Sequence, residues 1–484
     1  MTQMALAAPS RIAVSAGEAV VGMGGTAADA AVVMALVAMC TEPGVCAPGA
    51  GGYVTVDAGD GSPVVIDGYM AVPGLGFSGS VLRESVTMEY GGGVTTMVGP
   101  GTIGVPGSFA ALAVASERYG HMPWSELMGL VADTVEPGFP LSQACRTYLV
   151  DSGPLIFSQD PASRAALYNG DRLKETGESV RFVDLADTLR QIGEEGADTF
   201  YRGELAARIV ADLSARGSQI TSRDRDEYRP IIREPLRTEI AGWQVVANPP
   251  PAVGGVVVLD ALRAIADNAE PISHAVWRDA LVAALTHRRQ FEDTLGSDVD
   301  SLLAAAGLKS PSTVTVSAVD NDGIAVAATF SAGYGSGIVP KGTGLLMNNS
   351  VGEIELIPGG VDALVPGERM MSNMAPTTVR SGNDVIAIGS PGADRISSAL
   401  VITLIRFLLA GDSLEAAVEH PRLHPERIQP VAVAAEAGID LSGPEVRWYD
   451  EPHMFFGGVN SAGKVGGNLI AWADTRRVGA TAVV

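Results

Sequence analysis

Residues 311–330 read PSTVTVSAVDNDGIAVAATF. From residue 313 to residue 318, threonine or serine alternates with valine or alanine, which predicts a β-strand with one polar face. Asn321, Asp322 and Gly323 then supply a turn, because these residue types tolerate positive φ angles. Residues 324–331 form the return strand, so the stretch predicts a β-hairpin.

Patterns on either side of this hairpin predict a layered mixture of helices and strands. Helices are expected at 11–23, from an N-cap at Thr26 to about Cys40, at 204–216 within a mostly helical region 108–230, and near 395–410. Strands are expected at 53–57, 64–67 and 243–247. Residues 288–312 are polar and weakly patterned, which suits a mobile segment. This order of elements fits a layered α/β sandwich.

Composition and charge exclude several classes of protein. The chain has 484 residues, of which 46% are hydrophobic and 18% charged, as in a globular protein. A net charge of −22 disfavours binding to nucleic acids and to anionic membranes. The longest apolar run, residues 30–40, is shorter than the roughly 20 residues that a membrane helix needs. No export signal is recognised at the start, so a cytoplasmic location is expected.

Cysteine and histidine usage predicts neither a disulfide framework nor a metal site. The three cysteines are Cys40, Cys46 and Cys145; a Cys40–Cys46 bridge is possible, but Cys40 is better explained as a small core residue. His420 and His424 are four residues apart, but Pro421 interrupts helical spacing between them. We therefore expect no metal and no cofactor.

Short motifs along the whole chain resemble one enzyme family in their order. In sequence they are GGTAADAA at 24–31, GVPG at 104–107, PPPAVGG at 249–255, GSGIV at 335–339, LLMNN at 345–349, GSPG at 389–392, AVEHPRLH at 417–424 and DTRR at 474–477. Together they resemble the γ-glutamyltransferase family of N-terminal nucleophile hydrolases. That resemblance implies an α/β (α+β) fold of the four-layer αββα type. It also implies two chains, residues 1–312 and 313–484, that form one intertwined unit.

The resemblance also implies a catalytic apparatus. In this family a threonine freed by self-cleavage becomes the nucleophile, which corresponds here to Thr313 and to cleavage of the Ser312–Thr313 bond. A threonine hydroxyl needs a nearby base, and a new α-amino group with a pKa of about 8 can serve. Ser331 corresponds to a residue that holds this amine. Gly392 and Ala393 correspond to the pair whose backbone N–H groups stabilise the oxyanion.

The sequence departs from the family where the substrate binds. Tyr69 stands at the position of the arginine that grips a glutamyl α-carboxylate, and a tyrosine cannot form that bidentate ion pair. The other departures are Gly333 for asparagine, Ser350 for glutamine, Glu353 for the amine-binding aspartate, and Ser372-Asn373 for a serine pair. These changes predict that glutathione is not the substrate. The segment from Glu353 to Arg369 is short, which predicts an open cleft.

Several functions fit these observations. We favour a self-processing hydrolase or acyltransferase of intracellular specialised metabolism, with a small-molecule substrate, its own large and small subunits as partners, and no nucleic acid or membrane. One alternative is a hydrolase of carbon–carbon bonds in the biosynthesis of 4-alkyl-proline natural products, as in homologues from actinobacterial pathways. Others are a genuine γ-glutamyl hydrolase or transferase, an acylase, or an unprocessed inactive binding protein.

Overall fold

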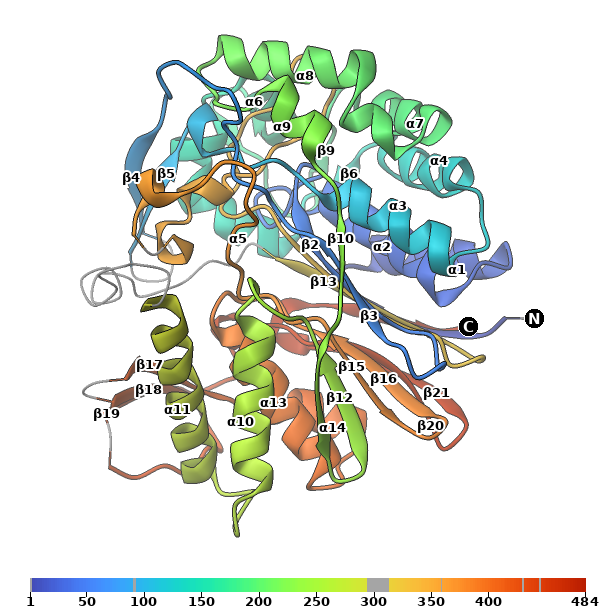
Figure 1. The fold of residues 1–484 in the computed structure, drawn as a ribbon, viewed down its shortest axis with the longest axis vertical. Helices are drawn as coiled ribbons and strands as arrows, with labels where there is room; N and C mark the ends of the chain where they lie inside the picture. The colour runs from blue at the N-terminus through green and yellow to red at the C-terminus, as the bar shows by residue number, and fades with distance from the viewer. Residues whose placement is uncertain (1, 90–92, 294–312, 358, 429–430, 444) are drawn as a thin grey trace.

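Two packed β-sheets with helices on both outer faces form the molecule (Figure 1). A computed structural model describes residues 2–89, 93–293, 313–357, 359–428, 431–443 and 445–484. The first sheet has the strand order β10 (Ile231–Arg233), β3 (Val64–Gly68), β2 (Gly51–Asp57), β14 (Ala325–Ser331), β13 (Val314–Asp320), β1 (Met4–Ala8) and β22 (Ala480–Val483). The second has the order β11 (Leu236–Ile240), β12 (Trp243–Ala247), β15 (Thr377–Ser381), β16 (Asp384–Gly389), β20 (Asn460–Val465) and β21 (Asn468–Ala473).

The helices divide between the two outer faces, which confirms the predicted four-layer αββα sandwich (Figure 1). The first sheet carries α1 (Arg11–Gly22), α2 (Ala27–Thr41), α3 (Ser108–Tyr119), α4 (Trp124–Val135), α5 (Gln143–Ser152), α6 (Pro161–Leu167), α7 (Leu185–Glu195), α8 (Gly203–Ala215) and α9 (Ser222–Glu227). The second carries α10 (Gly254–Ala266), α11 (His274–Asp293), α13 (Arg395–Leu408) and α14 (Leu414–Glu419). A small sheet of β17 (Leu423–Ile428), β18 (Val431–Glu436) and β19 (Glu445–Tyr449) lies beside α11.

The predicted local signals are confirmed where they come from short-range chemistry. Strands β13 and β14 form the expected antiparallel hairpin, with Val314 opposite Phe330. Thr26 caps α2 through a capping box with Asp29, and every residue of α2 is buried. The three cysteines are buried free thiols. In the described part of the chain, no helix is both long enough and apolar enough to cross a membrane.

The predicted polar face of the 313–318 strand is covered by the second sheet: Ser317 Oγ donates to the carbonyl of Asn460 at 3.0 Å, and within the first sheet Thr315 Oγ1 lies 3.0 Å from Thr329 Oγ1. One expectation needs correction. Residues 288–293 belong to helix α11 and are not an irregular segment; the rest of the 288–312 stretch lies outside the described residues.

Small side chains let the two sheets approach each other next to the hairpin. The cluster between the sheets consists of valines and alanines: Ala5, Val319, Ala325, Ala327, Val385, Ala387 and Ala462. Gly389 marks the closest approach, since a Cβ at this position would lie 2.1 Å from Thr315 Oγ1. The end of β16, and the loop that follows it, are therefore pressed against the hairpin that carries Thr313.

Candidate active site

Thr313 sits at the entrance of β13 and faces a small cavity. Only 6% of the residue is exposed. The cavity brings together residues from both parts of the chain: Tyr69, Thr313, Ser331, Glu353, Glu355, Leu356, Ser372, Asn373, Met374, Ala393 and Ile396. Most of the residues expected at the site thus surround Thr313. Ser312 lies outside the described residues.

The cavity is narrow, which contradicts the expected open cleft. Its volume is about 20 Å³, enough for roughly one water molecule. The short segment after Glu353 forms the 3₁₀ turn Ile354–Leu356, and Glu355 and Leu356 line the cavity. A short connection therefore still covers the site, because its side chains turn inward.

Ser331 lines the cavity with Thr313, whereas Gly333, two residues further on, is not part of the lining. Ser331 ends β14, and its Oγ accepts the N–H of Gly333 at 3.2 Å. Gly333 has a φ of +61°, and a Cβ there would lie 2.3 Å from Asn349 Oδ1 and 2.9 Å from Glu353 Oε2. Gly333 is therefore explained by backbone conformation and close packing, and it leaves room for Glu353.

Tyr69 is fixed deep in the site. Its ring stacks on Tyr53 with centroids 5.7 Å apart, its N–H donates to Asp67 Oδ1 at 2.9 Å, and its carbonyl accepts the hydroxyl of Tyr228 at 2.8 Å. Burial and then the charge of Glu353 raise the pKa of the Tyr69 phenol well above its usual value, while the hydroxyls of Ser372 and Ser350 oppose this shift. The predicted residues Tyr69, Ser350, Ser372 and Glu353 therefore lie side by side.

The carboxyl groups of Glu353 and Glu355 line the same cavity as Thr313, and the sequence analysis predicted only the first of them. Glu353 was expected; Glu355 was not, because nothing in the pattern around 353–356 shows which side chains turn inward. Burial raises the pKa of both groups; the charge of Glu355 adds to the shift of Glu353, and the charge of Asp394 adds to that of Glu355. The hydroxyl of Tyr334 donates to Glu355 Oε1 at 2.6 Å. No acceptor or donor within the described residues satisfies Glu353 Oε2.

Gly392 and Ala393 occupy the turn that leads into α13. The carbonyl of Gly392 accepts the N–H of Arg395 at 3.0 Å, and that of Ala393 accepts the N–H of Ile396 at 3.2 Å. In the described part of the chain, the N–H groups of Gly392 and Ala393 have no acceptor among the backbone hydrogen bonds. Ala393 adopts a left-handed φ of +53°. An alanine therefore keeps the backbone conformation that a glycine would favour.

Side chains behind this turn hold it in place. Asp394 accepts a hydrogen bond from Arg395 Nη1 at 2.6 Å and lies 3.4 Å from His424 Nε2, whose other ring nitrogen is 2.7 Å from Ser398 Oγ. Burial favours a raised pKa for Asp394, but Arg395 and His424 outweigh it, so the pKa falls below its ordinary value. Sequence reasoning missed this row of residues, which positions Ala393 from outside the cavity.

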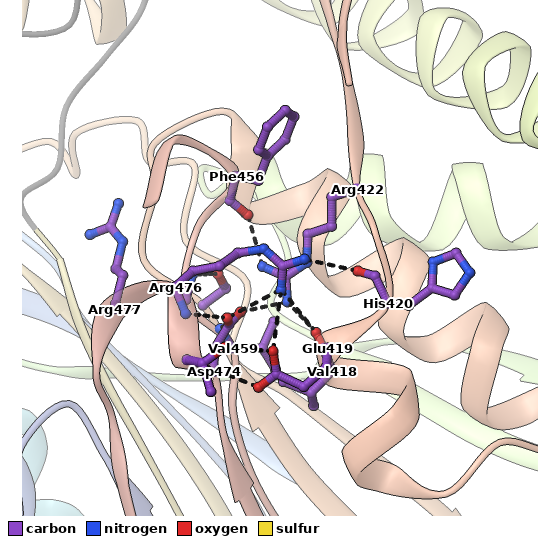
Figure 2. A network of polar contacts seen from close by, with 12 residues as sticks. Val418, Glu419, His420, Arg422, Phe456, Val459, Asp474, Arg476 and Arg477 are labelled. Carbon is purple, nitrogen blue, oxygen red and sulfur yellow. Dashed lines mark hydrogen bonds and ion pairs between the residues drawn. The ribbon is translucent and has the colours of Figure 1, made fainter. Parts of the chain in front are cut away.

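Figure 2 shows that residues from two of the family-like motifs, 417–424 and 474–477, join in one network of polar contacts. Arg422 pairs with Asp474 at 2.5 Å, and Arg476 bonds Asp474 at 3.2 Å. Arg422 Nη1 also donates to the carbonyl of Phe456 at 2.9 Å. The loop after Phe456 packs against the segment that leads to Gly392 and Ala393, since the N–H of Gly458 donates to Ser390 Oγ at 3.2 Å. This buried ion network therefore supports the site from behind.

No group of three His, Cys, Asp or Glu side chains in the described part of the chain is placed to hold a metal ion. The chemistry open to this arrangement is nucleophilic attack by a hydroxyl, with backbone N–H donors beside it.

Replacing Ala393 by glycine should stabilise the protein. A left-handed alanine costs about 1 kcal/mol, so Ala393→Gly should raise the free energy of unfolding by about that amount. Urea unfolding measures this change. As a control, Ala399→Gly inside α13 should lower stability by about 1 kcal/mol or more. A loss of stability in Ala393→Gly would show that the methyl group contributes packing that outweighs the strain.

The raised pKa of Glu353 predicts a pH-dependent stability. The native state keeps a proton at pH values where the unfolded chain, with a pKa near 4.5, has lost it. Stability should therefore fall as the pH rises above about 4.5, and level off only above the raised pKa. Glu353→Gln should make this slope shallower, by up to about 1.4 kcal/mol per pH unit, because the variant has no proton to lose. Unfolding measured from pH 4 to pH 8 tests this, with the exposed-site variant Glu204→Gln as control; an unchanged slope in Glu353→Gln contradicts it.

Comparison with known proteins agrees with the fold. The family model described as gamma-glutamyltranspeptidase matches residues 13–292 and 273–484. A glutathione hydrolase proenzyme from a Pseudomonas strain is 28% identical over 466 residues, which cover 86% of this chain and 80% of that protein. An acylase proenzyme from another Pseudomonas strain is 27% identical over 455 residues, covering 86% and 81%. The solved cephalosporin acylase from Bacillus halodurans has a TM-score of 0.81 at 22% identity, covering 99% of this chain and 96% of that one. The chain is a member of the gamma-glutamyltranspeptidase family.

Proposed function

We propose that this protein is a self-processing hydrolase in which cleavage of the Ser312–Thr313 bond makes Thr313 the N-terminal nucleophile. The products are subunits 1–312 and 313–484. Support comes from the position of Thr313 at the start of a central strand, with Ser331 and Ala393 on the same cavity. The proenzyme names of the glutathione hydrolase and acylase relatives also support processing.

In the proposed mechanism, the free α-amine of Thr313 takes the proton of its own hydroxyl, and Oγ1 attacks the substrate carbonyl. The N–H groups of Gly392 and Ala393 stabilise the oxyanion, and α13 adds the positive end of its dipole. The leaving group departs with the proton. Water then hydrolyses the acyl ester and restores the amine and hydroxyl. Ser331 holds the amine in place.

The side chains that line the cavity are the basis for the substrate class that we propose. Its described residues include two carboxylates, Glu353 and Glu355, and neither lysine nor arginine. A γ-glutamyl group would bring its α-carboxylate against Tyr69 and these acids, with no cation to pair it. The enzyme is therefore proposed to act on a short acyl group without a free carboxylate, and not on glutathione. A role in specialised metabolism stays a prediction from the sequence.

Mass spectrometry tests the processing. Wild-type protein should yield a chain that begins at Thr313, and Thr313→Ala should remain full-length, because the attacking hydroxyl is gone. Thr315→Ala, two residues further along the same strand, is the control and should still be cut if it folds. A Thr313→Ala protein cut between residues 312 and 313 would refute the assignment of the nucleophile.

Four matched anilides test the substrate class. Removal of the α-carboxylate from a γ-glutamyl group gives 4-aminobutyryl, removal of the amine gives glutaryl, and removal of both gives butyryl. We expect kcat/KM for the 4-aminobutyryl or butyryl compound to exceed that for the two carboxylate-bearing compounds by about tenfold or more, the value of one charged hydrogen bond. Faster turnover of γ-glutamyl or glutaryl anilide would overturn the proposal. Product identification by mass spectrometry separates amide from carbon–carbon cleavage.

A further inference from the structure

A second and larger cavity lies beside the catalytic one. Its volume is about 590 Å³, within the range of about 300–1,000 Å³ that is usual for small-molecule sites. It is lined by Ala71, Val72, Leu75, Val105, Asp224, Glu227, Tyr228, Arg229, Ile231, Arg233, Pro251, Gly367, Glu368 and Arg369. Val105 and Pro251 come from two of the sequence motifs to which the catalytic mechanism gives no role.

The two cavities share their walls. Residues 69–72 and 367–374 run side by side, with Ala71 bridged to Arg369 and the N–H of Val72 donating to the carbonyl of Glu368 at 2.8 Å. One end of each segment lines the catalytic cavity, through Tyr69 and Ser372, and the other end lines the second cavity. A molecule in the second cavity would therefore contact the segment that carries Tyr69.

One end of this cavity has an excess of positive charge. Arg233 Nε donates to Asp67 Oδ2 at 2.7 Å, and Arg369 Nε lies 3.6 Å from Asp67 Oδ1. Two guanidinium groups thus share one carboxylate, which is fully buried. Arg229 adds a third guanidinium, and its hydrogen bonds in the described residues go to the backbone carbonyls of Asp226 and Tyr228.

The acids of the cavity are mostly committed to other groups. Asp224 accepts the N–H groups of Gly74 and Leu75, at 2.9 and 2.8 Å. Glu227 pairs with Arg223 at 2.6 Å. Glu368 is the lining acid whose side chain has neither an ion pair nor a hydrogen bond among the described residues, and it is exposed. The remaining wall is apolar, from Ala71, Val72, Leu75, Val105, Ile231 and Pro251.

We propose that this cavity is a second binding site, for an organic acid whose carboxylate pairs with Arg229 and Arg233 and whose apolar body lies on the Val105–Ile231 wall. Guanidinium groups with unfilled donor positions match a carboxylate, because Arg233 commits only Nε to Asp67 within the described residues. The proposal is independent of the proposed reaction.

Isothermal titration of the full-length protein with three isosteric probes tests this site. The probes are 4-phenylbutyrate, its neutral amide 4-phenylbutyramide, and the cation 4-phenylbutylamine. We expect saturable binding of the acid, at least tenfold weaker binding of the amide, and weaker binding still of the amine. Arg229→Gln should weaken binding of the acid about tenfold, as expected for one charged hydrogen bond.

Variants of the same cavity provide the controls. Glu368→Gln, which removes a negative charge from the wall, should leave binding of the acid unchanged or tighter. Arg233→Gln should weaken it like Arg229→Gln; if Arg233→Gln unfolds because Asp67 loses a partner, the exposed Arg229 decides alone. The proposal is overturned if the acid binds equally well to Arg229→Gln, if the amine binds more tightly than the acid, or if the acid shows no saturable binding up to about 10 mM.

Discussion

The site depends on the position of strand β13 in the middle of the first sheet. β13 pairs with β14 from Val314 to Val319 and with β1 from Ser317 to Asp320, and it is covered by helices on one face and by the second sheet on the other. Its Thr313 end borders the cavity. The close inter-sheet packing that encloses β13 also presses the end of β16 against it, so the turn with Gly392 and Ala393 that follows β16 lies at the same cavity as Thr313.

Turns and helix caps, which depend on neighbouring residues, could be predicted from the sequence. What packs against each face of a strand could not. The 311–330 hairpin and the Thr26 cap follow from turn and cap residues, and both are present. The alternation of threonine and valine correctly indicates a strand, but a period of two residues does not reveal whether the polar face meets water or another sheet. For the same reason Glu355 was missed and the cleft was expected to be open: both depend on which side chains a short 3₁₀ turn directs inward.

The two neighbouring cavities differ in the charged residues that line them. The catalytic cavity has carboxylates, Glu353 and Glu355, and the second cavity has the arginine groups around Asp67. Asp67 joins them, because it accepts the N–H of Tyr69 on one side and pairs with Arg233 on the other. Tyr69 and Arg369 belong to the two paired segments, residues 69–72 and 367–374, that lie between the two cavities. Tyr69 therefore brings no positive charge to the first cavity, whereas Arg369 brings one to the second.

The strand order has a practical consequence for anyone who handles the protein. β1, from the start of the chain, lies between β13 and β22, and the β13–β14 pair lies between β1 and β2. Fragments produced by a cut before Thr313 would be interlocked: separating them would break continuous ladders on both sides of β1 and expose their amide groups. Gel filtration and native electrophoresis would record one particle in either case. Only denaturing conditions would distinguish a cleaved molecule from an intact one. If the two fragments were expressed separately, each would contain strands that lack their hydrogen-bonding neighbours.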